Sequence, residues 1–267
     1  MLLRSVFGKT IRDLRWPTFW IGSSVFLLAF YFTFAFPTYS SAFNLQDLLD
    51  KIPPAMKALI GGQLMDVSTV NGFLNIELFP FMLPAILGGY AIAQGSGLTA
   101  GEESRGTIDV LLSYPVSRRS LIVQKSMAAA IAVLVVAGAV WLGAVIGAGG
   151  SGSAIDGGDV AAGLVLASLL ALDIGALALA IGGWRGSRSG AAGIAAAVLV
   201  VSYFINALAP LIDTINSIRQ VSIFYWYLEG DPLRRGLAIG DAVILAIVGL
   251  VLFGAAVILF ERRNLAA

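Results

Sequence analysis

The chain has 267 residues, of which 58% are hydrophobic and only 12% charged, a composition that excludes an ordinary soluble domain and predicts an integral membrane protein. It contains no Cys and no His, which excludes disulfides, thiolate metal sites and the most common general base. The 17 Lys and Arg against 16 Asp and Glu give a formal charge of +1, which does not indicate a nucleic-acid-binding surface.

The N-terminal segment, residues 1–16, interleaves apolar side chains with the basic residues Arg4, Lys9, Arg12 and Arg15. This pattern predicts a basic amphipathic helix on the inner leaflet, ending where Trp16 and Pro17 turn the chain into the membrane. The apolar run that follows is too long for a cleavable signal peptide and has no small-residue cleavage site after it, so we expect it to remain as an anchor.

Six apolar stretches are long enough to cross the roughly 30 Å hydrocarbon core as helices. They comprise residues 17–36, 76–98, 126–148, 160–183, 190–210 and 239–260. Six spans place both termini on one side, and Lys and Arg divide 12 to 5 in favour of that side. The positive-inside rule therefore predicts a multi-pass protein of the plasma or inner membrane with cytoplasmic N- and C-termini.

The segments between the spans differ in kind. Outside lie residues 37–75, where apolar side chains at helical spacing over 45–52 predict an interfacial helix, and residues 211–238. Inside, the only long segment is 99–125. We see no internal repeat, which weakens a secondary-transporter interpretation slightly.

The inner segment 99–125 is patterned rather than merely polar. Two acids precede a Gly-Thr pair, an apolar face follows, a proline ends it, and a serine can cap the next helix, whose first turns are basic. A short helix of this kind is suited to docking on another protein. The alternative is an ordinary amphipathic loop whose basic residues only follow the positive-inside rule.

Asp173 is the one acid well inside a predicted span, about 13 residues into the fourth. A carboxylate at that depth costs on the order of 2.5 to 3.5 kcal/mol, so we expect it to face protein or water. It is either a substrate or proton site, or a structural group that is protonated in place or tied to Asn206 or Tyr203 of the fifth span.

Aromatic side chains follow one side of the first span, among them Phe26 and Phe30. Together with Tyr203 and Asn206 they are candidates for lining a pathway or a dimer interface, although packing against lipid or helices explains most such residues equally well. Two pairs have GxxxG spacing, Gly143 with Gly147 and Gly186 with Gly190. In a chain with 31 Gly such pairs arise by chance.

The run EESRGTIDVLLSYPVSRRSLIVQK resembles the signature between the second and third membrane helices of ABC-2 type permeases, the membrane subunits of ATP-binding-cassette exporters. Residues 225–233 and 260–265 agree with the bacterial drug and antibiotic exporter branch. The resemblance implies an all-α membrane fold of the type V exporter class, with residues 4–15 as an elbow helix. It also implies a coupling helix at about 101–113 that sits in a cleft of the ATPase. The residues implied in this ATPase-coupling loop are Glu102, Glu103, Arg105, Gly106, Thr107, Ile108, Leu111, Leu112, Pro115, Ser117 and Arg118.

A P-loop on the same chain is not expected. Gly8-Lys9-Thr10 is the only GK[ST] run, but position 3, where the motif needs its first glycine, is Leu3, so we assign the run to the elbow helix. The chain is thus predicted to be no enzyme and to hold no cofactor or metal of its own.

The resemblance implies three kinds of partner: two copies of a separate ATPase that binds ATP and Mg, a second permease copy or paralogue, and membrane lipids. No nucleic acid is expected. The predicted function is export, including multidrug efflux, of a hydrophobic or amphiphilic drug, antibiotic, peptide or lipid. The alternatives are a proton-coupled secondary transporter using Asp173 and a membrane anchor or assembly factor without transport activity.

Overall fold

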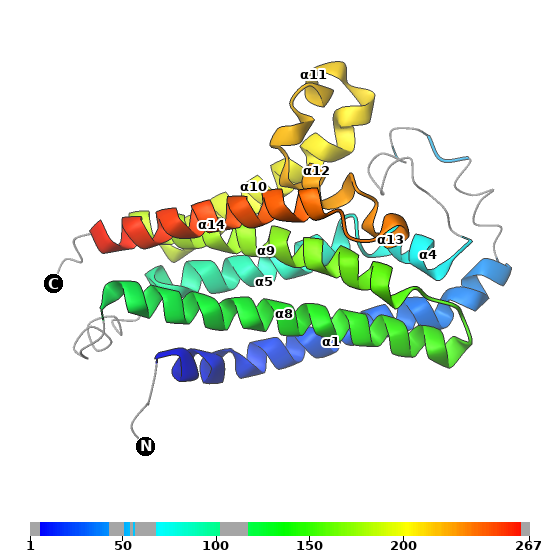
Figure 1. Cartoon of the computed structure of the whole chain (residues 1–267), viewed down its shortest axis with the longest axis horizontal. Helices are drawn as coiled ribbons and strands as arrows, with labels where there is room; N and C mark the ends of the chain where they lie inside the picture. The colour runs from blue at the N-terminus through cyan, green and yellow to red at the C-terminus, as the bar shows by residue number, and fades with distance from the viewer. Residues whose placement is uncertain (1–5, 43–50, 54–55, 57–67, 102–116, 263–267) are drawn as a thin grey trace.

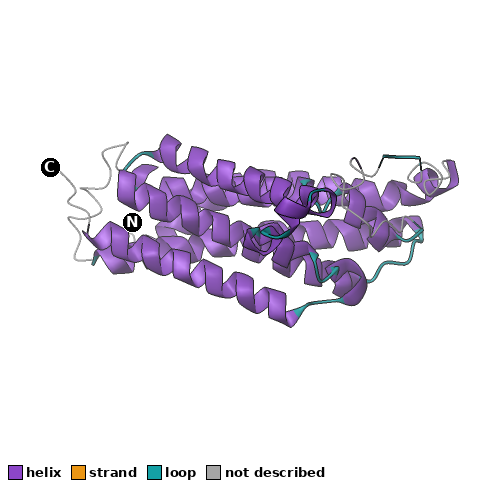
Figure 2. Cartoon of the chain, turned by 90° about the horizontal axis from the view of Figure 1, so that it is seen from above, coloured by secondary structure: helices purple, strands orange, loops and turns teal. Residues whose placement is uncertain are grey.

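The structure is a computed structural model that describes residues 6–42, 51–53, 56, 68–101 and 117–262. Within these ranges the chain forms helices joined by turns and loops, with no strand. The long helices lie side by side in one elongated bundle (Figures 1 and 2). The start of the first helix and the end of the last lie together on the left of Figure 1. We call this the terminal end of the bundle and the opposite one the distal end.

Five helices are long and apolar enough to cross a membrane: α1 (Val6–Ala42), α8 (Arg118–Ser151), α9 (Gly157–Arg185), α10 (Arg188–Leu208) and α14 (Ile239–Arg262). The helices α4 (Val70–Glu77) and α5 (Met82–Leu98) make a sixth candidate when the pair, bent by 54°, is counted as one span. The prediction of an all-helical membrane fold is therefore confirmed for the described part of the chain.

Helix α9 forms the centre of the bundle. It packs against α5, α14, α10 and α8, and 67% of its most apolar stretch is buried, against 17% in α14. Small residues make this possible, because Ala and Gly allow neighbouring backbones to approach closely. A Cβ on Gly95 of α5, for example, would overlap the carbonyl oxygen of Gly175 of α9.

Helix α1 differs from the prediction at its start. We expected residues 1–16 to form a separate helix that turns at Trp16 and Pro17, but residues 6–16 belong to α1, which continues past Pro17 without a break. The hydroxyl of Thr18 donates to the carbonyl of Leu14 (2.8 Å). The start of α1 is also held along α8, because the amide of Phe7 donates to Oε1 of Gln124 (3.1 Å).

The second predicted span, residues 76–98, is not one straight helix. Ile76 lies in α4, and residues 78–81 separate α4 from α5. Pro80 explains the break, since proline lacks an amide donor and disfavours helical geometry in the residue before it. The carbonyl of Phe79, in this break, accepts a buried hydrogen bond from the hydroxyl of Tyr227 (2.9 Å). Burial raises the pKa of Tyr227 well above its ordinary value, so this hydroxyl keeps its proton and remains a donor.

Residues 209–238 build a cap of short helices over the distal ends of α10 and α14, in yellow and orange in Figure 1, where α11 projects from the side of the bundle. They are η1 (Ala209–Leu211), α11 (Asp213–Asn216), η2 (Arg219–Val221), α12 (Ile223–Leu228) and α13 (Pro232–Arg235). The hydroxyl of Ser222 donates to the backbone carbonyl of Ser202 (2.6 Å), which fixes α12 to α10. The interfacial helix predicted at 45–52 lies mostly outside the described residues.

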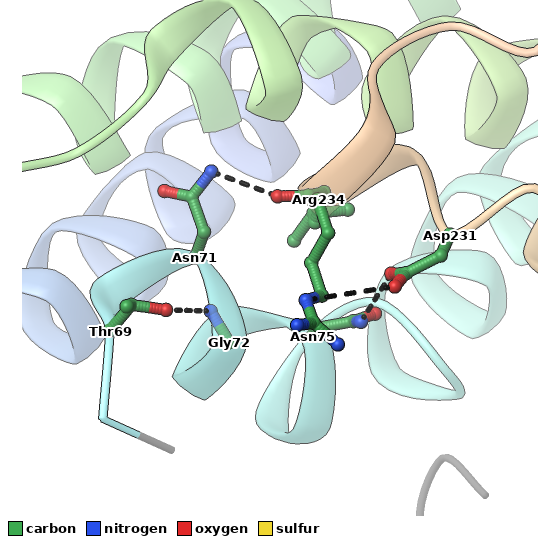
Figure 3. Close-up of polar contacts among 7 residues, drawn as sticks. Thr69, Asn71, Gly72, Asn75, Asp231 and Arg234 are labelled. Carbon is green, nitrogen blue, oxygen red and sulfur yellow. Dashed lines mark hydrogen bonds and ion pairs between the residues drawn. The ribbon is translucent and has the colours of Figure 1, made fainter. Parts of the chain in front are cut away.

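A polar cluster joins α4 to the cap (Figure 3). The side-chain amide of Asn71 donates to the carbonyl of Leu233 (3.1 Å) and to that of Asp156 (3.3 Å), and its oxygen accepts from the Asp156 amide (3.2 Å). The amide of Asn75 donates to Oδ1 of Asp231 (3.1 Å), whose Oδ2 lies 3.9 Å from Nε of Arg234. Asp231 itself is 2% exposed and has φ of 48°, a left-handed conformation that Asp tolerates better than most residues.

Asp231 should make stability depend on pH. Burial raises its pKa from the ordinary 3.8, and Arg234, Arg235 and the Asn75 hydrogen bond oppose that rise. Because the folded state binds this proton more tightly than the unfolded state, the stabilising contribution is complete below pH 3.8 and is lost as pH rises through the raised pKa. Lowering the pH from 7 towards 4 is therefore expected to raise the melting temperature of the wild type relative to Asp231→Asn. A melting difference that stays constant over this range, measured in one detergent, would contradict the assignment.

Candidate functional site

Residues 102–116 of the inner segment are flanked at the terminal end by the end of α5 and the start of α8. Ser117 caps α8 by accepting a hydrogen bond from the amide of Ser120 (3.2 Å), as predicted, and Arg118 lies half-buried in the first turn. Lys125, 3% exposed, donates from Nζ to the carbonyl of Leu98 at the end of α5 (3.1 Å). The end of α5 is thus tied to the second turn of α8.

The other predicted residues of this loop fall within 102–116, outside the described residues. They are Glu102, Glu103, Arg105, Gly106, Thr107, Ile108, Leu111, Leu112 and Pro115. The end of α5 and the start of α8, which flank this segment, lie at the terminal end, where α1 starts and α14 ends (Figure 1). The run Gly8-Lys9-Thr10 is helical, and the hydroxyl of Thr10 donates to the carbonyl of Val6 (2.9 Å), which is helix geometry and not a phosphate-binding loop.

Asp173 lies on α9 and is 2% exposed. Its Oδ2 has no hydrogen-bond partner among the described residues. The predicted tie to Asn206 is not formed, because Oδ1 of Asn206 accepts instead from Nε of Arg219 (3.0 Å). The residue facing Asp173 across the helix pair is Gly249 of α14, where a Cβ would come within 2.5 Å of the Asp173 Oδ1.

A cavity of about 400 Å³ adjoins Asp173 between α5, α8, α9 and α14. The described residues that line it are apolar apart from the side chains of Gln94, Ser126 and Asp173. The Ser126 hydroxyl is also buried and has no hydrogen-bond partner among the described residues. At 1.5 Å per residue, Asp173 lies about 18 Å along the helix from the end of α9 at Arg185. The cavity is therefore in the terminal half of the bundle, within the spans.

Phe26 and Phe30 are half-buried on α1 and stack on one another, with ring centres 6.3 Å apart, and Phe34 extends the stack. Their backbones lie against α8. A Cβ on Gly143 would overlap the carbonyl oxygen of Phe26, and one on Gly147 would come within 2.5 Å of the carbonyl oxygen of Phe30. The Gly143 and Gly147 pair is thus an interhelical contact, contrary to our expectation that its spacing arose by chance.

Tyr203 and Asn206 are buried on α10 and belong to the packing beneath the distal cap. The ring of Tyr203 packs against Phe81 and Phe224, with centres 5.1 and 5.5 Å away. Asn206 holds Arg219, whose guanidinium also forms an ion pair with Glu229 (3.0 Å). The structure therefore does not bring these two residues together with the phenylalanines of α1, since α1 packs mainly on α8 whereas α10 packs on α9 and α5.

Two residues that the sequence analysis did not name as candidates hold separate helices together: Lys125 joins α5 to α8, and Asn71 joins α4 to the cap. Lys125 is a lone cation at the start of a long apolar run, which is a usable signal for a structural role because a buried charge needs a partner. Asn71 shows no such signal, since asparagine is common in ordinary loops.

A family model described as ABC-2 family transporter protein matches residues 5–265. The match covers every described helix and the segment 102–116. No curated protein gave a match.

Proposed function

Since the chain belongs to the ABC-2 family of transporter proteins, the membrane subunits of ATP-binding-cassette transporters, we propose that it exports a hydrophobic or amphiphilic substrate, using ATP hydrolysed by a separate ATPase. It is a multi-pass membrane protein. The observation that carries the proposal is the family match over nearly the whole chain, in which the ends of α5 and α8 flank the segment 102–116 at the terminal end.

The structure supports a lever role for this end. Helix α8 is a single helix of 34 residues, about 51 Å long, that begins directly after the segment 102–116. Lys125 ties it to α5, and Gln124 ties it to α1, so a displacement of the loop would move three helices together. In the proposed mechanism the ATPase binds the loop mainly through the apolar side chains of Ile108, Leu111 and Leu112. Glu102 and Glu103 form weaker ion pairs at the rim of this interface.

A working transporter of this kind needs two permease halves, so we propose a homodimer or a pair with a paralogue, served by two ATPase subunits. The described bundle leaves a broad apolar surface on α1 and α10, including Phe19, Trp20 and Phe204. Lipid or a second permease would cover this surface.

Co-purification tests the coupling loop. The chain is expressed with the ATPase encoded beside it, and the combined variant Glu102→Ala, Glu103→Ala, Leu111→Asp is compared with the wild type. We expect equimolar ATPase with the wild type and at least a tenfold loss with the variant, because an aspartate at position 111 would be buried in the docking surface.

The matched control is Glu261→Ala, which removes an exposed acid at the same end but outside the loop and should leave ATPase recovery unchanged. Absence of ATPase from the wild-type preparation, or full recovery with the loop variant, would refute coupling through residues 102–116. That result would favour a proton-coupled transporter using Asp173 or a membrane anchor without transport activity.

A further inference from the structure

The cavity beside Asp173 has features that the coupling mechanism does not use. Two buried polar groups in its wall, Oδ2 of Asp173 and the hydroxyl of Ser126, have no hydrogen-bond partner among the described residues. Buried polar atoms are nearly always paired in folded proteins, so two that find no partner in the described protein, both from residues lining one cavity, are candidates to pair with a polar ligand. The volume of about 400 Å³ falls in the range of small-molecule sites.

The chemistry of the wall defines what fits. Among the described residues that line it, Asp173 is the only ionisable one, and Gln94 and Ser126 are the only others with polar side chains. Lys125, next to Ser126 in the sequence, directs its ammonium to the carbonyl of Leu98. A carboxylate in such a wall is satisfied best by a ligand that brings its own positive charge, and the apolar remainder suits an apolar body.

The rim of the cavity shows how such a ligand would reach it. Met127 of α8 is 55% exposed and Leu250 of α14 is 69% exposed, and both line the cavity. They lie on α8 and α14, two helices that are long and apolar enough to cross a membrane, so in a bilayer an opening between these helices would face the hydrocarbon. A ligand that partitions into the bilayer could therefore enter from the side.

Gly249 fixes the position of the carboxylate. A Cβ there would come within 2.5 Å of the Asp173 Oδ1, which is the far end of a side chain, so a larger residue would displace the carboxylate rather than separate α14 from α9. The close approach confines one oxygen of Asp173 against α14 and leaves the other, Oδ2, without a protein partner.

We propose that this cavity binds lipophilic amines, which enter laterally from the bilayer. The ligand's ammonium group pairs with Asp173 and donates to the hydroxyl of Ser126, while its apolar part lies against the walls from α5 and α8. That the bound amine is also the exported substrate rests on the proposed function. The binding itself does not.

The test is equilibrium binding to the chain in lipid nanodiscs without ATPase. The probes are dansylcadaverine, a fluorescent primary amine, and its N-acetyl derivative, which has nearly the same body but no charge. We expect the wild type to bind the amine at least about tenfold more tightly than the amide, and Asp173→Asn to lose this preference while it still binds both weakly. One tenfold step corresponds to about 1.4 kcal/mol.

Two further variants keep the test decisive if Asp173→Asn does not fold. Leu250→Trp enlarges an exposed residue at the rim and should weaken the binding of both probes by obstructing the opening. The control is Asp241→Asn, which changes an acid in the first turn of α14 outside the cavity wall and should alter the affinity for neither probe. Equal affinity of the wild type for the two probes, a charge preference retained by Asp173→Asn, or unaltered binding by Leu250→Trp would each overturn the proposal. Because the co-purification assay needs no ligand and this assay needs no ATPase, either proposal can fail alone.

Discussion

Replacing Gly143 and Gly147 together with valine is expected to separate α1 from α8 and to leave no folded protein. A Cβ at Gly143 would overlap the carbonyl oxygen of Phe26, and one at Gly147 would come within 2.5 Å of the carbonyl oxygen of Phe30. The backbone of a helix cannot yield as a flexible side chain does, so α1 would have to move away along the largest helix pair in the bundle. Overpacking typically costs about 1–3 kcal/mol per site, and two sites on one face add to this.

The measurement is recovery of monodisperse protein by gel filtration in mild detergent, followed by thermal unfolding of whatever is recovered. Single Gly143→Ala should already lower the melting temperature. The matched controls are Gly138→Val and Gly149→Val on the same helix, where an added Cβ meets nothing within 4 Å. If the double variant were as monodisperse and as stable as these controls, close packing through the glycine pair would be refuted.

The packing of Gly143 and Gly147 against α1 illustrates which structural features a single sequence can predict and which it cannot. Bilayer thickness imposes a minimum apolar length, and for that reason α8, α9 and α14 each contain a stretch predicted from hydrophobicity alone. Which glycine faces a neighbouring backbone depends instead on what lies opposite in space. Gly143 and Gly186 have the same sequence spacing to a second glycine, yet Gly186 ends α9 in a left-handed turn with φ of 68°.

The same distinction holds for the candidate site. The burial of Asp173 could be predicted, because a lone acid within an apolar run must lie inside the bundle. Its neighbours could not, since the cavity wall combines α5, α8, α9 and α14, and no sequence pattern relates Ser126 to Gly249. The break after α4 has a signal in Pro80. Hydrophobicity alone conceals this break, because residues 78–87 form an unbroken apolar run.

Replacing Asn71 with alanine is expected to destabilise the distal end by about 2–4 kcal/mol while leaving the terminal end intact. The amide of Asn71 connects three elements: it lies in α4, exchanges two hydrogen bonds with the backbone of Asp156 before α9, and donates to the carbonyl of Leu233 in α13. Alanine would leave the amide of Asp156 and the carbonyl of Leu233 without these partners, whereas the Asp156 carbonyl still accepts from the Val160 amide (3.1 Å). Each buried unpaired group costs about 1–3 kcal/mol, less wherever water can replace the partner.

Thermal unfolding and ATPase co-purification, carried out on the same preparation, test both parts of this expectation. Asn216→Ala serves as the matched control, because Asn216 is exposed on α11 and its truncation removes the same group from the same cap. Asn71→Ala should melt well below this control yet recover as much ATPase as the wild type, since the end of α5 and the start of α8, which flank the loop, lie at the opposite end. Equal melting of the two variants would mean that Asn71 does not hold the cap. Loss of ATPase at a temperature where the variant remains folded would instead mean that the two ends are mechanically linked through α8 and α9, the helices that run from one end to the other.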